Sequence, residues 1–177
     1  ITLRQVLLYP QRSGTLNIDK MTCDAIIRVR NTGPSRSIFD DFFDTYQEIV
    51  KPLATNTEKI EVKALPEGKP SGFSGAAGTF TLSSSINKQD LTENESVTIK
   101  LKISGNGNIK LLKNPEIKFP ADFEVYDPKV ENNFTNTTSG VNGTKTIEYL
   151  AIPRHSGTFS IPPVEFSYFD TKTKTYK

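Results

Sequence analysis

Apolar and polar residues alternate along most of this chain, and this spacing is typical of half-buried β-strands. The first alternating runs are residues 16–18, 21–29 and 60–62. Further runs are residues 80–82, 97–103, 109–111, 117–119, 123–125, 147–149, 159–161 and 164–168. We therefore predict an all-β protein made of short strands separated by turns, as in an antiparallel β-sandwich of immunoglobulin type.

An internal repeat adds a second constraint. The tripeptide Ser-Gly-Thr occurs at residues 13–15 and again at residues 156–158, and each copy has a proline three positions before it and an isoleucine three positions after it. Two copies of one module explain this repeat, whose offset is 143 residues (153 minus 10). Several predicted strands precede the second copy and only residues 1–9 precede the first, so we expect the first module to lack its beginning. The nine residues after Tyr168 lead us to expect that the second module lacks its last strand.

The repeat divides the chain into three predicted parts. Residues 1–65 are predicted to be the C-terminal part of an immunoglobulin-like module, and residues 79–177 a second such module. Between them, residues 66–78 contain two prolines and four glycines. This composition predicts an interdomain linker.

One segment departs from the alternation. In residues 38–50 the apolar side chains recur at the three-to-four spacing of a helix, with acidic residues between them. Ser37 is a candidate N-cap, and Pro52 ends the pattern. We therefore predict a short helix inserted into the first module, near residues 38–50.

The predicted helix contains the candidate docking residues of this chain. Its aromatic rings have two interpretations: they cover the open end of the sandwich, which is the commoner role of an apolar helical stripe, or they stay exposed beside the acids as a protein-docking surface. The residues that would form this surface are Phe39, Asp40, Asp41, Phe42, Phe43 and Tyr46.

The residue types that carry catalysis are sparse. His155 is the only histidine, so it forms neither a catalytic triad nor a usual zinc cluster, and we read it as a solvated turn residue. The single cysteine, Cys23, lies in an alternating run and is expected to be a buried structural thiol. We predict no enzyme activity, no cofactor and no metal site.

The charge and hydropathy of the chain limit the classes of partner that it can bind. The net charge of +2 is spread along the chain, which argues against nucleic acid or an acidic membrane as the main partner. No apolar run is long enough to cross a bilayer, so we expect no membrane contact by this chain itself.

Several ordered blocks resemble a known family. They are residues 38–44, 65–70, 73–76, 103–108, 123–129, 148–154 and 161–166. With these blocks the sequence resembles the BatD family, the aerotolerance-associated or "oxygen tolerance" envelope proteins of bacteria, and most closely its members from the Bacteroidetes. The resemblance implies an exported, membrane-anchored protein of the periplasm with tandem immunoglobulin-like ectodomain modules. It also implies neighbours encoded beside it, namely MoxR-type AAA+ ATPases and proteins with von Willebrand A domains.

Two functions remain open from the sequence. The first is a non-catalytic protein-interaction ectodomain linked to aerotolerance or stress response, with the neighbouring von Willebrand A-domain and MoxR-type ATPase proteins as expected partners. The second is a carbohydrate-binding or adhesin-like sandwich, because the polar loops and scattered tyrosines suit sugar contact and the fold hosts both functions.

Overall fold

The structure is a computed structural model that describes residues 5–30, 46–138 and 140–177. It divides into two units, a larger one made of residues 5–9 with Pro66–Lys177 and a smaller one within Pro10–Leu65. Among the described residues, every regular element except the 3-10 helix Ile109–Leu111 is a β-strand, which confirms the predicted all-β fold.

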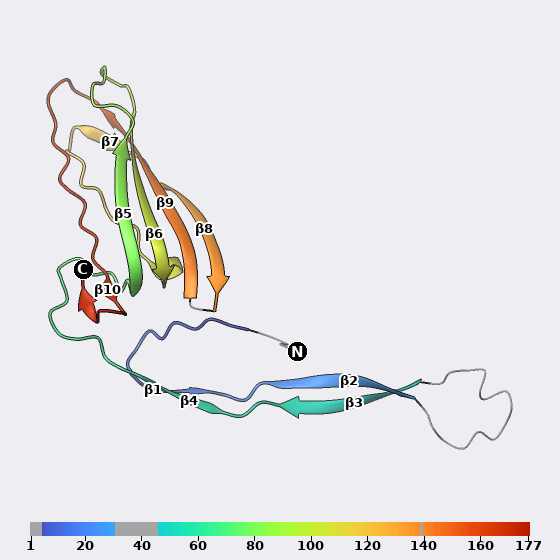
Figure 1. Ribbon diagram of the computed structural model, residues 1–177. Helices are drawn as coiled ribbons and strands as arrows, with labels where there is room; N and C mark the ends of the chain where they lie inside the picture. Colours follow the sequence, from blue (N-terminus) through green and yellow to red (C-terminus); the bar gives the residue numbers. More distant parts are fainter. Residues whose placement is uncertain (1–4, 31–45, 139) are drawn as a thin grey trace, which may run out of the picture. The chain divides into compact units, whose positions relative to one another are not determined.

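A five-stranded antiparallel sheet forms the larger unit (Figure 1). Its order is β5-β6-β9-β7, and β8 also pairs with β9. The strands are β5 (Gly78–Ile86), β6 (Val97–Gly107), β7 (Phe123–Val125), β8 (Lys129–Thr137) and β9 (Gly140–Pro153). Because paired residues lie on the same face, the register sorts the side chains into two faces.

The core lies on one face of this sheet. Leu101 of β6 is fully buried, and its cross-strand partner Ile147 of β9 is buried beside it. Two residues further along β6, and on the same face, Ile103 pairs with Lys145. The opposite face is polar, as shown by Ser104 and Thr144, whose hydroxyls are 3.2 Å apart.

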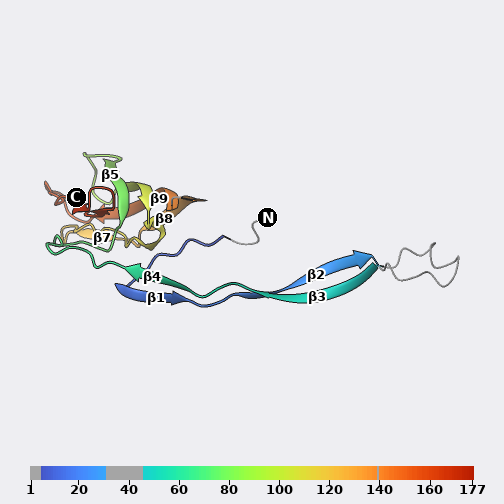
Figure 2. The same cartoon turned by 60° about the horizontal axis from the view of Figure 1, so that its bottom comes forward.

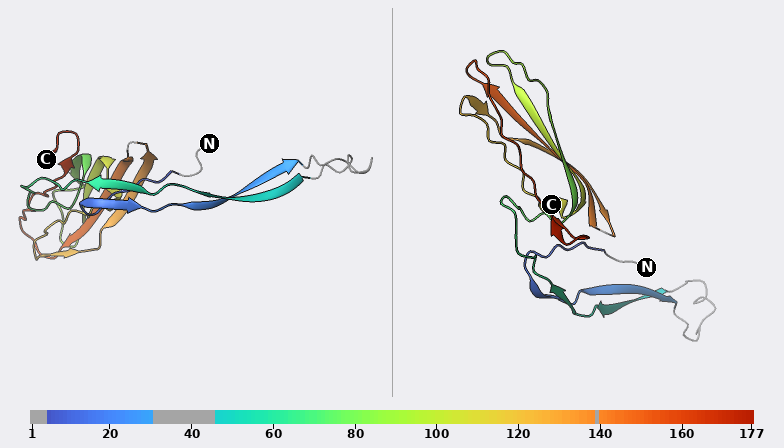
Figure 3. Two further views of the ribbon diagram at one scale, coloured as in Figure 1. Left: turned by 90° about the horizontal axis from the view of Figure 1, so that it is seen from below. Right: turned by 60° about the vertical axis from the view of Figure 1, so that its left-hand side comes forward.

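Two extended segments without strand pairing cover the core face. They are residues 112–122 and 154–168, and Figure 3 shows the second returning from β9 towards β10. Their half-buried side chains pack against the sheet core, namely Ile117, Phe119, Ile161, Val164, Phe166 and Tyr168. The predicted sandwich-like layering is therefore present, although its second layer is largely irregular.

Side chains from the sheet hold the first covering segment. Lys145 is buried, and its Nζ donates a 2.6 Å hydrogen bond to the Leu112 carbonyl oxygen. The Tyr149 hydroxyl donates to the Pro115 carbonyl oxygen. Burial lowers the pKa of Lys145 and raises that of Tyr149. These bonds satisfy carbonyl groups that a neighbouring strand would otherwise satisfy.

The predicted linker residues also lie against the larger unit. Asn108 accepts a 2.8 Å hydrogen bond from the Ala77 amide at its Oδ1, and its Nδ2 donates to the Gly75 carbonyl oxygen at 2.7 Å. Ala76 is fully buried, and its carbonyl oxygen accepts from the Phe169 amide at 2.7 Å. Residues 75–77 are thus part of the packed structure of this unit.

At the N-terminal side of the larger unit, Tyr9 bridges two strands. Its hydroxyl donates to the Gly107 carbonyl oxygen at 2.8 Å and accepts from the Val141 amide at 3.0 Å. Gly107 and Val141 are register partners at the end of the β6–β9 ladder. The Tyr9 side chain therefore fastens residues 5–9 to the sheet end, which the sequence pattern did not indicate.

The C-terminus forms a short hairpin of β10 (Phe169–Asp170) and β11 (Thr175–Tyr176). Tyr168 and Lys177 exchange two backbone hydrogen bonds of 2.9 Å. The buried Asp170 carboxylate accepts from the Lys172 and Thr173 amides and from Lys177 Nζ at 2.8 Å. These bonds tie residues 172–177 into the hairpin.

This hairpin predicts a local pH dependence. The Lys177 ammonium, followed by the two backbone amides, lowers the pKa of Asp170 from 3.8 to about 2. The stabilisation from this carboxylate is thus present above pH 3.8 and is lost as the pH falls through about 2. We expect Asp170→Asn to reduce the hydrogen-exchange protection of the Tyr168 and Lys177 amides at pH 5 to 7, whereas Asp127→Asn, in an exposed position, leaves it unchanged. Hydrogen-exchange rates measured by NMR give the protection of these two amides. Equal protection in wild type and Asp170→Asn would contradict the stabilising role of the Asp170 carboxylate.

The smaller unit consists of two two-stranded antiparallel ladders (Figure 2). β1 (Gly14–Ile18) pairs with β4 (Glu58–Val62), and β2 (Thr22–Arg30) pairs with β3 (Tyr46–Ala54). The predicted strands at residues 16–18, 21–29 and 60–62 are confirmed. That residues 1–65 are the C-terminal part of an immunoglobulin-like module stays a prediction.

The predicted helix near residues 38–50 is wrong where the structure describes it. Tyr46–Val50 belongs to β3, and the rest of the predicted helix lies outside the described residues. Tyr46, Ile49 and Val50 are residue types that favour strands, and each is directly paired with a residue of β2. Cross-strand pairing therefore overrides the helical spacing of this segment.

Four predicted strands of the second module need correction. Residues 109–111 form the 3-10 helix. Residues 117–119, 159–161 and 164–168 belong to the unpaired covering segments, and β10 begins only after them, at Phe169. These segments contain prolines, which lack the N–H that a ladder requires. Conversely, residues 132–144 are rich in Asn, Thr and Gly, as loops often are, yet they are mostly the paired ends of β8 and β9. The two copies of the repeat also differ, because residues 14–18 are a strand and residues 157–161 are not.

Candidate functional site

The predicted docking residues fall largely outside the described part of the chain. This holds for Phe39, Asp40, Asp41, Phe42 and Phe43. Tyr46, the sixth, is the first residue of β3, opposite Arg30, and is 54% exposed. The docking role of these six residues thus stays a prediction, although the segment that holds them connects β2 to β3.

Next to that segment, the β2–β3 ladder carries an exposed apolar row. Register and alternation place its members on one face of the ladder: Cys23, Ala25, Ile27, Val29, Ile49 and Leu53. Ile27 and its direct partner Ile49 are 43% and 46% exposed. We call these six residues the apolar row.

Cys23 belongs to the apolar row and is exposed. The expectation of a buried structural thiol was wrong, because the alternation identified the apolar face correctly while no described residue of the smaller unit covers it. On the opposite face, Arg28 Nε and Glu48 Oε1 form an ion pair of 2.9 Å. That face also carries Ile26 and Val50, which are 65% and 59% exposed, but it holds the charged residues Asp24, Arg28 and Glu48 as well and is the more polar of the two.

A pocket lies at the end of the larger unit where the β5–β6 loop meets the chain after β9. Its volume is about 360 Å³. The apolar side chains that line it, which we call its floor, include Ile86, Leu91, Val97, Phe123, Phe159 and Ile161. The polar side chains that line it, which we call its rim, include Lys88, Asp90, Glu93 and His155. We call this the end pocket.

Register brings the two loops of the end pocket together. Val97, where β6 begins, pairs with Ala151, shortly before β9 ends at Pro153. The loop that leads into β6 and the loop that follows β9 must therefore meet at the same edge. Asn87, Asp90, Ser156 and Gly157 are residue types that favour turns, but the meeting of the two loops depends on this pairing.

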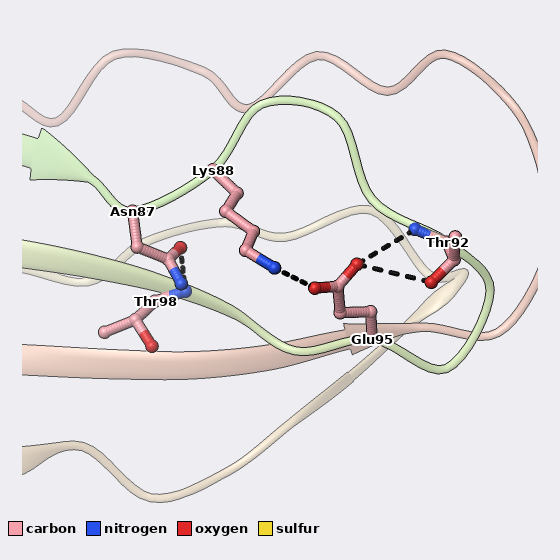
Figure 4. A network of polar contacts seen from close by, with 5 residues as sticks. All are labelled: Asn87, Lys88, Thr92, Glu95 and Thr98. Atoms are coloured by element: carbon pink, nitrogen blue, oxygen red, sulfur yellow. Dashed lines mark hydrogen bonds and ion pairs between the residues drawn. The ribbon is translucent and has the colours of Figure 1, made fainter.

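A polar network fixes the β5–β6 loop (Figure 4). The Glu95 carboxylate forms an ion pair with Lys88 and accepts hydrogen bonds from the amide and hydroxyl of Thr92 at 3.2 and 3.3 Å. Hydrogen bonding from Lys88, then from Thr92, lowers the pKa of Glu95. At the base of the loop, Asn87 Oδ1 accepts from the Thr98 amide at 2.8 Å.

Arg154 joins this loop to β7. Its Nη1 donates to Asn94 Oδ1 at 2.7 Å, and its Nε donates to Glu124 Oε2 at 2.8 Å. The Asn94 amide donates to the Pro153 carbonyl oxygen at 3.2 Å. Arg154 lowers the pKa of Glu124, and Glu124 in turn raises that of Arg154. The wall of the end pocket is thus held in place by contacts from three elements.

His155 lies at the rim of the end pocket and is exposed, in agreement with its reading as a turn residue. In the described part of the chain, no group of three or more His, Cys, Asp or Glu side chains is placed to hold a metal ion. In the same part of the chain, no helix is long and apolar enough to cross a bilayer.

Comparison with known proteins gives one match. Residues 84–177 match the family model described as the BatD DUF11-like domain. The matched range begins within β5 and includes both loops of the end pocket. No curated protein and no solved structure matches the chain.

Proposed function

The chain belongs to the BatD family, whose members are aerotolerance-associated envelope proteins, and from this premise we propose that it acts as a non-catalytic protein-interaction ectodomain. In this proposal the protein is membrane-anchored, and the described units lie in the periplasm. Its partners are the proteins that the family resemblance implies, namely the von Willebrand A-domain and MoxR-type ATPase system components encoded beside it.

The observation that carries the proposal is the exposed apolar row of the β2–β3 ladder. A two-stranded ladder is at most marginally stable in water when nothing packs on it. Here Ile27, Ile49 and Leu53 stand exposed together on one face. Gln47 and Lys51 share this face, but most of its side chains are apolar, and an exposed face of this composition marks a surface that another polypeptide covers.

The location of the row supports a protein as the ligand. It adjoins the segment that holds the predicted docking residues from Phe39 to Tyr46, because that segment joins β2 to β3. Large aromatic residues are common at the centres of protein interfaces. We propose that the row and residues 39–43 form one docking surface for a von Willebrand A-domain partner, whereas Tyr46 lies on the opposite face of the ladder, paired with Arg30.

The proposal predicts that the apolar row is needed for partner capture. We expect Ile27→Ser/Ile49→Ser to weaken capture of the purified von Willebrand A-domain protein at least about ten-fold, since a central apolar residue of an interface contributes on the order of 1–2 kcal/mol. Titration of that protein onto the immobilised chain measures the effect.

The matched control is Ile26→Ser/Val50→Ser, which replaces a directly paired couple on the opposite face of the same ladder. We expect this control to bind like wild type. Equal capture by both double variants and by wild type would contradict the assignment of the row, and failure of wild type to bind would contradict the proposed partner.

Carbohydrate binding is the second candidate, and the polar outer face of the five-stranded sheet is the observation that favours it. Thr81, Ser104, Thr144 and Asn133 follow one another across four strands of this face. Sugar sites usually add an aromatic ring that stacks on the sugar, whereas Phe80 and Tyr149 of this sheet lie on its core side. We therefore prefer the protein partner, and binding of the chain to a glycan array would reverse this preference.

A further inference from the structure

The end pocket has the properties of a recognition site for a peptide segment. Its lining combines apolar and polar side chains, and two of the apolar ones, Phe123 and Phe159, have their rings in edge-to-face contact at 5.1 Å. Its volume of about 360 Å³ is sufficient for one large side chain and part of its backbone. The contacts of Glu95 and Arg154 hold its wall in place before any ligand arrives, which lowers the entropy cost of binding.

The neighbouring strand edge suits an extended ligand. β5 is the edge strand of the sheet, and its last residue, Ile86, is 42% exposed although it lies on the core side. Among the described residues, the outer edge of β5 has one pairing next to it, the isolated bridge between Ala77 and Phe169. This bridge lies just before Gly78, the first residue of β5. An extended segment can add to such an edge through its backbone and place alternate side chains towards the core.

The charges of the rim indicate which kind of peptide segment the end pocket can bind. Lys88 is neutralised by its ion pair with Glu95. Asp90 and Glu93 belong to none of the ion pairs found among the described residues, so the rim carries an excess of negative charge. A ligand that fits the floor and complements this rim has an apolar side chain next to lysine or arginine.

We propose that the end pocket binds an extended basic segment of a protein partner, with one apolar side chain on the floor and a lysine or arginine facing Asp90 and Glu93. This inference deepens the proposed function and rests on it. It adds a second contact surface, separate from the apolar row, and states the chemistry of its ligand.

Three fluorescein-labelled peptides test the inference by fluorescence anisotropy with the full chain. The first is Gly-Ser-Lys-Val-Leu-Val-Lys-Thr-Ser-Gly, the second has glutamate in place of both lysines, and the third has serine in place of leucine. We expect the basic peptide to bind, the acidic peptide to bind at least about ten-fold more weakly, and the serine peptide at least about five-fold more weakly. Binding of the basic peptide should weaken with added salt, because exposed charges are screened.

The matched variants separate the pocket from general surface charge. Asp90→Asn/Glu93→Gln is expected to weaken binding of the basic peptide by about three- to ten-fold, as for two exposed ion pairs. Glu116→Gln/Asp127→Asn removes two exposed acids outside the pocket and should leave binding unchanged. Melting temperatures of both variants should equal that of wild type.

The inference is overturned if no peptide binds at about 1 mM, if the lysine and glutamate peptides bind equally, or if both double variants behave alike. Its failure is distinguishable from failure of the proposed function. Capture of the von Willebrand A-domain protein through the apolar row, without peptide binding, would leave the proposed function standing and remove this inference.

Discussion

Leu101→Ala is expected to lower the free energy of unfolding of the larger unit by about 2–5 kcal/mol, the usual cost of removing a leucine side chain from a packed core. Leu101 is 0% exposed and lies in the middle of β6, between two neighbouring strands. Extended segments cover the same face, so the surroundings cannot close the cavity without moving several elements. Urea unfolding measures the change, followed by far-UV circular dichroism and tyrosine fluorescence because the chain has no tryptophan.

Leu53→Ala is the matched control for this prediction. It makes the same chemical change in β3, where Leu53 is 42% exposed. We expect its effect on the free energy of unfolding to stay below about 1 kcal/mol, since a half-exposed side chain loses little burial on truncation. Similar losses for both variants would show that the face containing Leu53 is as tightly packed as the core of the larger unit.

Gly107→Ala is expected to destabilise the larger unit by more than about 2 kcal/mol. The φ of Gly107 is 148°, and a Cβ atom there would lie 2.3 Å from the Ala77 carbonyl oxygen and 2.9 Å from the Gly78 Cα. These are backbone atoms of the paired strand and its approach, so β5 and β6 would have to separate. The strain of the backbone conformation alone costs about 1–3 kcal/mol, and the collision adds to it.

Gly68→Ala separates these two causes. Gly68 also has a positive φ, of 85°, but a Cβ there would meet no atom within 4 Å. We expect this control to show only the conformational cost, so that its loss of stability is smaller than that of Gly107→Ala. Thermal unfolding of both variants measures the difference, and equal losses would show that the close approach of β5 and β6 relaxes without cost.

The alternation of apolar residues predicted more about packing than about pairing. Residues 159–168 alternate, and Ile161, Val164 and Phe166 do pack on the core. Yet these residues form no ladder, and Pro162 and Pro163 among them have no N–H to donate. The pattern reports which side of an extended chain faces the core, whereas a ladder also requires a partner with free backbone groups.

The segment around Tyr46 shows a different reason for error. Tyr46, Ile49 and Val50 fit both the helical spacing and the residue preferences of a strand. The partner strand β2 decides between them, because Ile27 lies opposite Ile49 and Ile26 opposite Val50. These partners are more than twenty positions away in the sequence, so no local pattern contains them.

The end pocket was missed for the same reason. The residues around Asn87 and around Ser156 are of types that favour turns, and the local sequence assigns a function to neither segment. The pairing of Val97 with Ala151 places both turns at one end of the sheet, and the contacts of Arg154 fasten them to each other. A signal was present in the apolar residues within both turns, Leu91 and Phe159, which a solvated loop does not need.

The sequence by itself determined the all-β class, the core-facing side of the extended segments of the larger unit, and the family, because alternation and ordered residue blocks are local properties of a chain. Only the tertiary structure decided which segments pair, that the C-terminal hairpin is held by Asp170, and that two distant turns form the end pocket. Strand pairing and side-chain contact join residues that are far apart in the sequence, and the free energy of each such contact depends on what the rest of the fold brings beside it.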